Sequence, residues 1–448
     1  MTIIDLLGML RVVDDRDDLP VAVIGAGPVG LAAAAQLIRR GITPLILEAG
    51  AAVGSGVLGW GHVRIFSPWK YDIDSAARAL LEGRGWTAPD PEAYPTGREL
   101  VESYLAPLAA LPEVARHLRL EHRVVAVTRL GLDKLKTAGR ERVPFALTVE
   151  TPSGELRLIA RAVIDASGTY GLPNPLGASG TPARGEEHAR ERVFYGIADV
   201  LGRDRQRYAG RRTLVVGSGH SAFDVLIDLA NLAQTDPRTT VTWLTRRPIA
   251  EATYGGAEHD ALPARGALGA KMRGLVDHGA VRQVVLRIAD VRLDGGEVYV
   301  GDGASEVGPF DEIVATTGFR PDLAPLRELR LRLDDVLEAP AALAPLIDPN
   351  VHSCGTVPPH GARELAHPER DLFIVGMKSY GRAPTFLMLT GYEQVRSVAS
   401  ALAGDIAGAQ ATELTLPETG VCSGGPASDC CVTSDAIIPV SALTGAPR

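Results

Sequence analysis

The chain has 448 residues, 46% of them hydrophobic and 22% charged, a composition that allows a core large enough for about three domains. The formal net charge of −8 argues against nucleic acid or an anionic membrane surface as the main partner. No apolar run approaches the roughly 18 residues that span a bilayer, and the N-terminal segment carries acid where a signal peptide needs base, so a cytoplasmic location is expected.

The first predicted nucleotide-binding unit covers residues 20–48. An apolar strand over 21–24 runs directly into a glycine-rich turn and an alanine-rich helix, which is the context that the G-x-G-x-x-G fingerprint requires. In this interpretation Gly25 permits the tight turn, Gly27 lets the main chain approach a pyrophosphate, and Gly30 lets the helix pack on the strand. The sequence therefore predicts a dinucleotide site at the start of this helix.

Two further residues are assigned to this site. Pro28 lies inside the fingerprint, where the helix N-terminus offers free N–H groups and a partial positive charge to phosphates. The next strand, over 44–47, ends at Glu48. A carboxylate at that strand end can accept hydrogen bonds from an adenosine ribose and would repel a 2′-phosphate.

The segment that follows is predicted to mix loops, a helix and strands. Residues 49–95 look loop-rich with aromatic side chains, and 104–115 have helical periodicity. The composition of 152–154 indicates a hairpin turn. Alternating patterns predict three strands, over 123–130, 145–150 and 156–164.

The second predicted nucleotide-binding unit covers residues 213–245. A strand over 213–216 leads into a second glycine-rich turn and a helix over 223–232. Ala222 replaces the third glycine, which the fingerprint tolerates. No catalytic residue is assigned, and none of the turn side chains is expected to be one. The turn residues assigned to this site are Gly217, Gly219, His220 and Ser221.

The second unit differs from the first at the end of its second strand. The strand over 241–245 ends in Arg246 and Arg247 rather than in an acid. Cations at that position favour a 2′-phosphate, and hence NADPH over NADH, although two arginines that simply face solvent remain the alternative. Strands over 298–300 and 312–315 are expected to close this unit.

The remainder of the chain supplies one more buried strand, over 372–376, and a helix over 392–402. From about residue 408 periodicity is lost and the composition becomes that of a mobile tail. Two fingerprint turns about 190 residues apart imply two nucleotide-binding domains rather than one.

These units, with three more segments, resemble the FAD/NADPH flavoproteins that include flavin-containing monooxygenases and thioredoxin reductases. Residues 165–170, with Gly168, are similar to the crossover strand where the chain leaves the FAD domain, and 315–321, with Gly318, are similar to the return crossover. Residues 372–376 resemble the late FAD strand.

The late FAD segment departs from the family pattern. Family members usually carry Gly-Asp there, whereas this chain has Gly376, Met377 and Lys378. Gly376 and Met377 are still assigned to the cofactor site by the resemblance. An aromatic cluster in the loop-rich segment, Trp69 above all, is expected to wall the flavin pocket together with Trp60, Phe66 and Tyr71.

The resemblance implies an α/β fold with two Rossmann-like dinucleotide-binding domains, FAD and NADPH as cofactors, and a small-molecule substrate with O₂. The FAD domain, 1–175 and 318–408, is split around an NADPH domain over 176–317, and a cysteine-containing tail covers 409–448. A homodimer is left open.

The positions that lack cysteine distinguish between the disulfide reductases and the monooxygenases of this superfamily. Disulfide reductases need a redox cysteine pair beside the flavin, yet residues 54–59 and 176–317 contain none. That absence favours a monooxygenase, in which NADPH reduces FAD and O₂ is activated for transfer to a soft nucleophile. The alternatives are an NADPH-dependent reductase of a thiol-bound metal or disulfide, and a non-catalytic metalloid-binding flavoprotein.

Three of the four cysteines gather near the C-terminus. Cys422, Cys430 and Cys431 supply soft thiolates within ten residues, and the layout of 61–69 and 376–382 is similar to flavoprotein monooxygenases of arsenic-resistance clusters. The tail is therefore hypothesised to capture a trivalent arsenical, against an incidental tail or an inert thiol site. No firm metal site is predicted.

Cys354 is the fourth candidate substrate thiol. With His352 and His360 it lies in a loop just before the late FAD strand, close enough in sequence to reach the flavin pocket. Packing of the thiol in the core is the favoured alternative.

Overall fold

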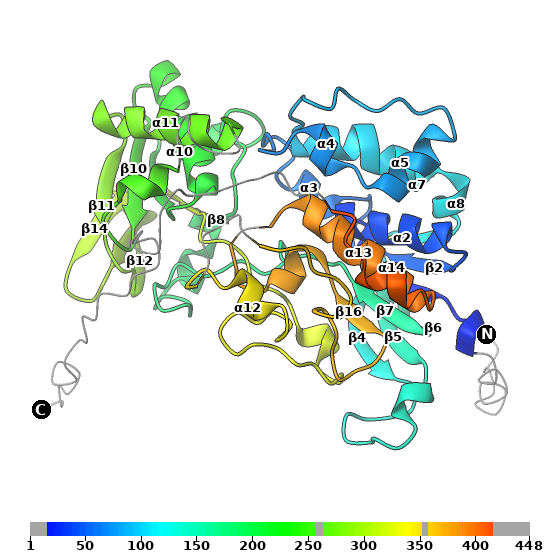
Figure 1. Ribbon diagram of the computed structural model, residues 1–448. Helices are drawn as coiled ribbons and strands as arrows, with labels where there is room; N and C mark the ends of the chain where they lie inside the picture. The colour runs from blue at the N-terminus through cyan, green and yellow to red at the C-terminus, as the bar shows by residue number, and fades with distance from the viewer. Residues whose placement is uncertain (1–15, 256–262, 352–356, 385, 415–448) are drawn as a thin grey trace, which may run out of the picture.

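The computed structural model describes residues 16–255, 263–351, 357–384 and 386–414 (Figure 1). Two α/β units lie side by side, and each is built around a parallel sheet of five strands. Within these ranges no helix is both long and apolar enough to cross a membrane. The predicted fold class is confirmed. The domain boundaries at 175/176, 317/318 and 408/409 stay predictions.

The first sheet draws one edge strand from late in the chain. The four residues of β1 are all buried, as expected for a parallel strand that is covered on both faces. The strand order is β16 (Leu372–Ile374), β7 (Ala162–Asp165), β1 (Val21–Ile24), β2 (Pro44–Leu47) and β3 (Leu118–Arg119).

One face of the first sheet packs on helices α2 (Pro28–Arg39) and α13 (Met388–Leu402). The other face packs on an antiparallel sheet of three strands. That second layer consists of β4 (Arg123–Arg129), β5 (Phe145–Thr151) and β6 (Gly154–Ala160).

The second unit repeats this layering with its own elements. Helices α10 (His220–Thr235) and α11 (Pro263–Asp277) cover one face of the second parallel sheet, and a three-stranded antiparallel sheet covers the other. The parallel order is β11 (Arg282–Val285), β10 (Thr240–Thr245), β9 (Arg212–Val216), β15 (Glu312–Ala315) and β8 (Val193–Tyr195). The antiparallel strands are β12 (Asp290–Asp294), β13 (Glu297–Gly301) and β14 (Glu306–Phe310).

A set of short helices connects β2 to β3. They are α3 (Ser55–Leu58), α4 (Trp69–Asp72), α5 (Ser75–Glu82), α6 (Gly97–Leu100), a π-helical turn (Val101–Leu105), α7 (Ala106–Ala110) and α8 (Pro112–Ala115). Elsewhere the chain forms α9 (Arg205–Tyr208), α12 (Ala344–Ile347), the 3₁₀ turn η9 (Gly376–Tyr380) and α14 (Ile406–Gln410).

Several sequence-based boundaries are wrong. The single strand predicted over 156–164 is two strands, β6 and β7, in different sheets, because the N–H of Arg161 bonds to Pro20 O and the chain changes layer there. The strand predicted at 298–300 is present as β13, which lies in the antiparallel sheet of the second unit.

The helix predicted over 104–115 begins earlier, at Gly97, where Thr96 and Glu99 form a capping box, and it breaks at Leu111 before a proline. The loop-rich segment contains the amphipathic helix α5, capped by Asp74. Residues 166–170 are an irregular connection, not a strand, since β7 ends at Asp165.

Candidate dinucleotide-binding sites

The first glycine-rich turn has the geometry that a pyrophosphate needs. Gly25 has a φ of +96°, and a Cβ there would lie 2.8 Å from Ala166 O. Gly27 caps α2, and apart from its chain neighbours and its own helix no described residue has an atom within 4 Å of where its Cβ would stand. A side chain at Gly30 would collide with the carbonyl oxygen of Gly25. Strain and crowding thus explain the outer glycines, while open space in front of Gly27 leaves room for a ligand.

Glu48 helps to shape this turn. Its carboxylate, on a residue that is 9% exposed, accepts hydrogen bonds from the N–H of Ala26 at 2.7 Å and of Gly50 at 2.9 Å. Pro28 occupies the first helical position of α2, where a missing N–H costs no helical bond. The acid at the end of β2 is therefore fixed by the main chain beside the turn, and its contact with a ribose stays a prediction.

The second glycine-rich turn repeats the geometry of the first. Gly217 has a φ of +140°, and a side chain there would collide with Thr316. Gly219 caps α10 with no heavy atom within 4 Å of its Cβ position. The indole Nε1–H of Trp243 donates to Gly217 O at 2.6 Å and so stabilises the turn. Ser221, in the first turn of α10, is half-buried.

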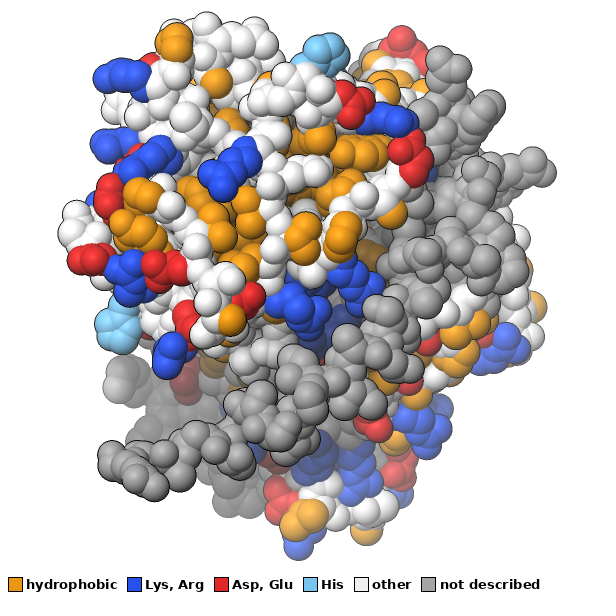
Figure 2. Space-filling view, turned by 90° about the vertical axis from the view of Figure 1, so that its left-hand side faces the viewer, with side chains coloured by type: hydrophobic (Ala, Val, Ile, Leu, Met, Phe, Trp, Pro, Cys, Tyr) orange, Lys and Arg blue, Asp and Glu red, His pale blue; other side chains and the backbone are white. Residues whose placement is uncertain are grey.

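The end of β10 carries a cluster of three arginines. Arg246 and Arg247 follow the strand, and both are exposed. Burial of part of the side chain lowers the pKa of Arg246, and the guanidinium groups of Arg287 and Arg247 lower it further. Figure 2 shows one face of the molecule, on which Lys and Arg side chains gather near the centre below an apolar area.

Arg287 was missed by the sequence analysis. It comes two residues after β11, which pairs in parallel with β10 so that Thr245 stands opposite Val285. The two strands therefore deliver their following residues to the same edge of the sheet. The signal in the sequence was a short apolar run, 284–286, that ends in an arginine.

The two units touch through aromatic side chains. The ring of Phe66 lies 5.4 Å from the imidazole of His220, which is also 5.6 Å from Phe223 in α10. Trp69, 5% exposed, packs in an apolar cluster with Ala26 of the first glycine turn. Phe66 is thus brought to the second turn and Trp69 to the first, and their contact with a flavin stays a prediction.

The two connections between the units are tied to each other. Asn174 donates its main-chain N–H to Gly318 O and accepts from the hydroxyl of Thr317 at 2.6 Å. The rings of Tyr170 and Phe319 lie 4.8 Å apart. Gly318 has a φ of +83°, a conformation that other residues rarely adopt.

The late strand of the first sheet ends in a polar anchor. Gly376, with a φ of +68°, donates its N–H to Gln394 Oε1 at 2.7 Å, and Met377 is partly exposed. Lys378 forms a buried ion pair with Asp165, their Nζ and Oδ2 atoms 2.7 Å apart. The sequence analysis noted the missing carboxylate at this position, and it missed the pairing.

The four predicted substrate thiols, Cys354, Cys422, Cys430 and Cys431, lie outside the described residues, as does His352. His360 is 4% exposed, and its Nε2 lies 2.9 Å from Gln394 Nε2 in the core beneath α13. Burial lowers the pKa of His360. Among the residues that the structure describes, no group of three His, Cys, Asp or Glu side chains could hold a metal ion.

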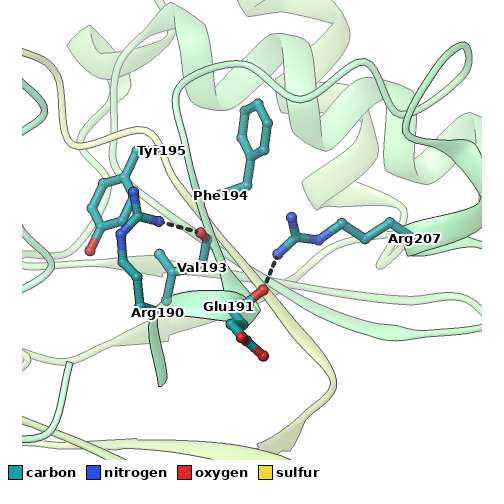
Figure 3. Close-up of a pocket in the computed structure, with 6 residues that line it drawn as sticks. All are labelled: Arg190, Glu191, Val193, Phe194, Tyr195 and Arg207. Carbon is teal, nitrogen blue, oxygen red and sulfur yellow. Dashed lines mark hydrogen bonds between the residues drawn. The ribbon is translucent and has the colours of Figure 1, made fainter. Parts of the chain in front are cut away.

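A pocket of about 470 Å³ opens at the outer edge of the second sheet, along β8 (Figure 3). Arg190 donates to Val193 O at 3.1 Å, and Arg207 donates to Glu191 O at 2.9 Å. No residue assigned to a nucleotide site lines it.

Comparisons with known proteins agree with this architecture. A ferredoxin–NADP reductase of Salinispora arenicola is 30% identical over 322 residues, which are 71% of this chain and 79% of the relative. The bacillithiol disulfide reductase of Bacillus cereus is 18% identical and superposes with a TM-score of 0.61 over 86% of this chain and 99% of that one. The cadaverine monooxygenase DfoA of Erwinia amylovora, solved with FAD, is 15% identical with a TM-score of 0.59 over 89% of this chain and 98% of that one.

The family model described as pyridine nucleotide-disulphide oxidoreductase matches residues 22–342, a span that contains both glycine turns, Glu48 and the arginine cluster. The chain belongs to the pyridine nucleotide-disulphide oxidoreductase family.

Proposed function

We propose that this protein is an NADPH-dependent FAD oxidoreductase, with FAD at the first glycine turn and NADPH at the second. One observation carries the assignment. The two turns have the same open geometry at Gly27 and Gly219, but opposite charges stand at the equivalent strand ends, Glu48 after β2 and Arg246 after β10. An acid suits a ribose with free hydroxyls, and a guanidinium cluster suits a 2′-phosphate.

The residues present fit both cofactors. No side chain of the described residues caps the N-terminus of α2 or of α10, and open space lies in front of the central glycines, which suits pyrophosphate oxygens. The ferredoxin–NADP reductase relative and the FAD-bound monooxygenase neighbour support the same pair of nucleotides. Bound FAD supplies hydride acceptance and reactivity toward O₂, while the chain binds and orients the nucleotides.

We further propose that the terminal acceptor is O₂ and the substrate a soft nucleophile. The stretches where related disulfide reductases carry a redox cysteine pair, 54–59 and 176–317, contain no cysteine in this sequence. A thiol relay between flavin and substrate therefore has no donor pair in either place. A trivalent arsenical, captured by Cys422, Cys430 and Cys431, is the specific substrate proposed, because soft thiolates bind soft ions well.

A second candidate is reductase chemistry without O₂. The named activities of two similar proteins, ferredoxin–NADP reductase and bacillithiol disulfide reductase, favour it. In that case electrons leave the flavin for a protein, a thiol-bound metal or a disulfide, with the tail cysteines as relay. The non-catalytic alternative is a flavoprotein that binds a metalloid and does not turn over NADPH.

The test is NADPH oxidation with parallel oxygen uptake by FAD-loaded protein, with and without arsenite or methylarsenite. Acceleration of both by the arsenical, with pentavalent product, supports the monooxygenase. NADPH oxidation that takes up no oxygen and depends on added ferredoxin or a disulfide would assign the protein as a reductase instead. A Cys430→Ser/Cys431→Ser variant should keep basal NADPH oxidation and lose the response to the arsenical.

A further inference from the structure

A polar triad that contains a buried ion pair stands where strands β7 and β16 of the first sheet end. The side chains of Lys378 and Asp165 are each 2% exposed, and Nζ lies 2.7 Å from Oδ2. Ser167 completes the triad, because its Oγ accepts from Lys378 Nζ at 2.9 Å and donates to Asp165 Oδ1 at 2.6 Å. The main-chain N–H of Ser167 also donates to Asp165 Oδ1, at 3.1 Å.

The sheet register puts this triad directly beside the first glycine turn. Asp165 is the last residue of β7 and stands opposite Ile24, the last residue of β1, and opposite Ile374 of β16. A Cβ at Gly25 would lie 2.8 Å from Ala166 O and 3.0 Å from the Cα of Ser167. The triad thus lies at the carboxyl ends of the parallel strands, where nucleotides bind in folds of this class.

The connection that follows Asp165 is partly open to solvent. Ser167 is exposed although its hydroxyl is held from behind, and Gly168 has a φ of +69° with no heavy atom within 4 Å of its Cβ position. Lys378 Nζ donates to both Asp165 and Ser167. The lysine therefore fixes the hydroxyl of Ser167 as well as the carboxylate at the end of β7.

Stability alone does not account for a pair buried this deeply. Taking two charges out of water costs several kcal/mol per ion, and apolar replacements of buried ion pairs are commonly neutral or stabilising. The segment that carries Lys378 is also fixed by its neighbour Ser379. The Oγ of Ser379 donates to Gly376 O and accepts a hydrogen bond from Gln394 Nε2. The ammonium is therefore delivered to Asp165 by a rigid segment.

We propose that the Asp165–Lys378 pair positions FAD by holding Ser167 and Gly168 against the flavin nucleotide. The inference rests on the proposed binding of FAD at the first glycine turn. Lys378 is a positioning residue in this account.

A double substitution separates this role from a structural one. Lys378→Met alone leaves a buried carboxylate without its partner, so the unliganded protein should melt at a lower temperature. Asp165→Asn/Lys378→Met removes both charges and should restore most of that melting temperature. FAD affinity, measured by quenching of flavin fluorescence on titration into the unliganded protein, should stay about tenfold or more weaker than in the wild type.

The matched control is a buried ion pair whose arginine also donates to Gly408 O. Arg396 and Glu393 of α13 are 5% and 7% exposed with an N–O distance of 2.7 Å. Glu393→Gln/Arg396→Met should leave FAD affinity within about twofold of wild type. Wild-type FAD affinity in the Asp165→Asn/Lys378→Met protein would overturn the positioning role. A wild-type protein that binds no FAD would overturn the cofactor assignment itself.

Discussion

The ring of Phe66 meets the imidazole of His220 edge-on, with centroids 5.4 Å apart and planes inclined by 67°. Phe66 lies in the connection between β2 and β3 of the first unit, and His220 opens helix α10 of the second. Their contact links the connection that follows the first glycine turn to the start of the second.

Phe66→Ala should slow flavin reduction by NADPH. An aromatic pair of this kind is worth about 0.5–1.5 kcal/mol, so its loss should lower the rate by about two- to tenfold if the contact holds the sites together. Stopped-flow absorbance of the flavin measures this step. Phe66→Tyr keeps the ring and should stay near the wild-type rate. Equal rates in the alanine and wild-type proteins would mean that the contact does not govern the approach of the two sites.

Gly27→Ala and Gly219→Ala form a reciprocal pair. Neither new methyl group meets an atom within 4 Å, and both residues have ordinary negative φ values, so the melting temperature should hardly change. The methyl at residue 27 should weaken FAD binding about tenfold or more and spare NADPH, while the one at residue 219 should do the reverse. Loss of the same cofactor in both variants would contradict the assignment of the two turns.

Replacing Arg246 and Arg247 with alanine should raise the KM for NADPH strongly and that for NADH little, because a 2′-phosphate loses charged partners worth about 1.5–3 kcal/mol. Adding Arg287→Ala should widen the gap further. Arg238→Ala, which removes an exposed arginine on the turn before β10, is the control. Parallel increases for both coenzymes would remove the 2′-phosphate assignment.

Asp72 should make stability depend on pH near neutrality. Its carboxyl is fully buried, and its Oδ2 has no hydrogen-bond partner among the residues that the structure describes. Burial raises the pKa of Asp72 to about 7, against a hydrogen bond from Ser67 that lowers it. A raised folded-state pKa means that the stabilisation by the protonated form is complete below about pH 4 and is lost as pH rises toward 7.

Asp72→Asn removes this titration and should therefore melt higher than wild type at pH 8, with the difference shrinking toward pH 5. Three other titratable groups lie near Asp72, namely Asp74, Tyr104 and Tyr392. Both proteins contain them, so their contributions to the pH dependence of stability cancel in the comparison. Differential scanning calorimetry over pH 5–8 provides the measurement. A constant difference across that range would show that Asp72 does not titrate there.

The sequence by itself determined both glycine turns and the fold class. A turn that requires positive φ at Gly25, open space at Gly27 and close packing at Gly30 is specified by consecutive residues, so its pattern can be read without the fold. The charges at the ends of β2 and β10 could also be predicted from the sequence, because each charged residue directly follows its strand in the chain.

Only the tertiary structure decided which distant residues meet. Lys378 and Asp165 are 213 residues apart, and they pair because β16 and β7 are neighbours in one sheet. Arg287 reaches Arg246 because β11 lies beside β10. The run over 156–164 is apolar in both of its strands, and only the layer change at Arg161 divides it. Such pairings depend on the order of strands and the packing of layers, which local spacing does not encode.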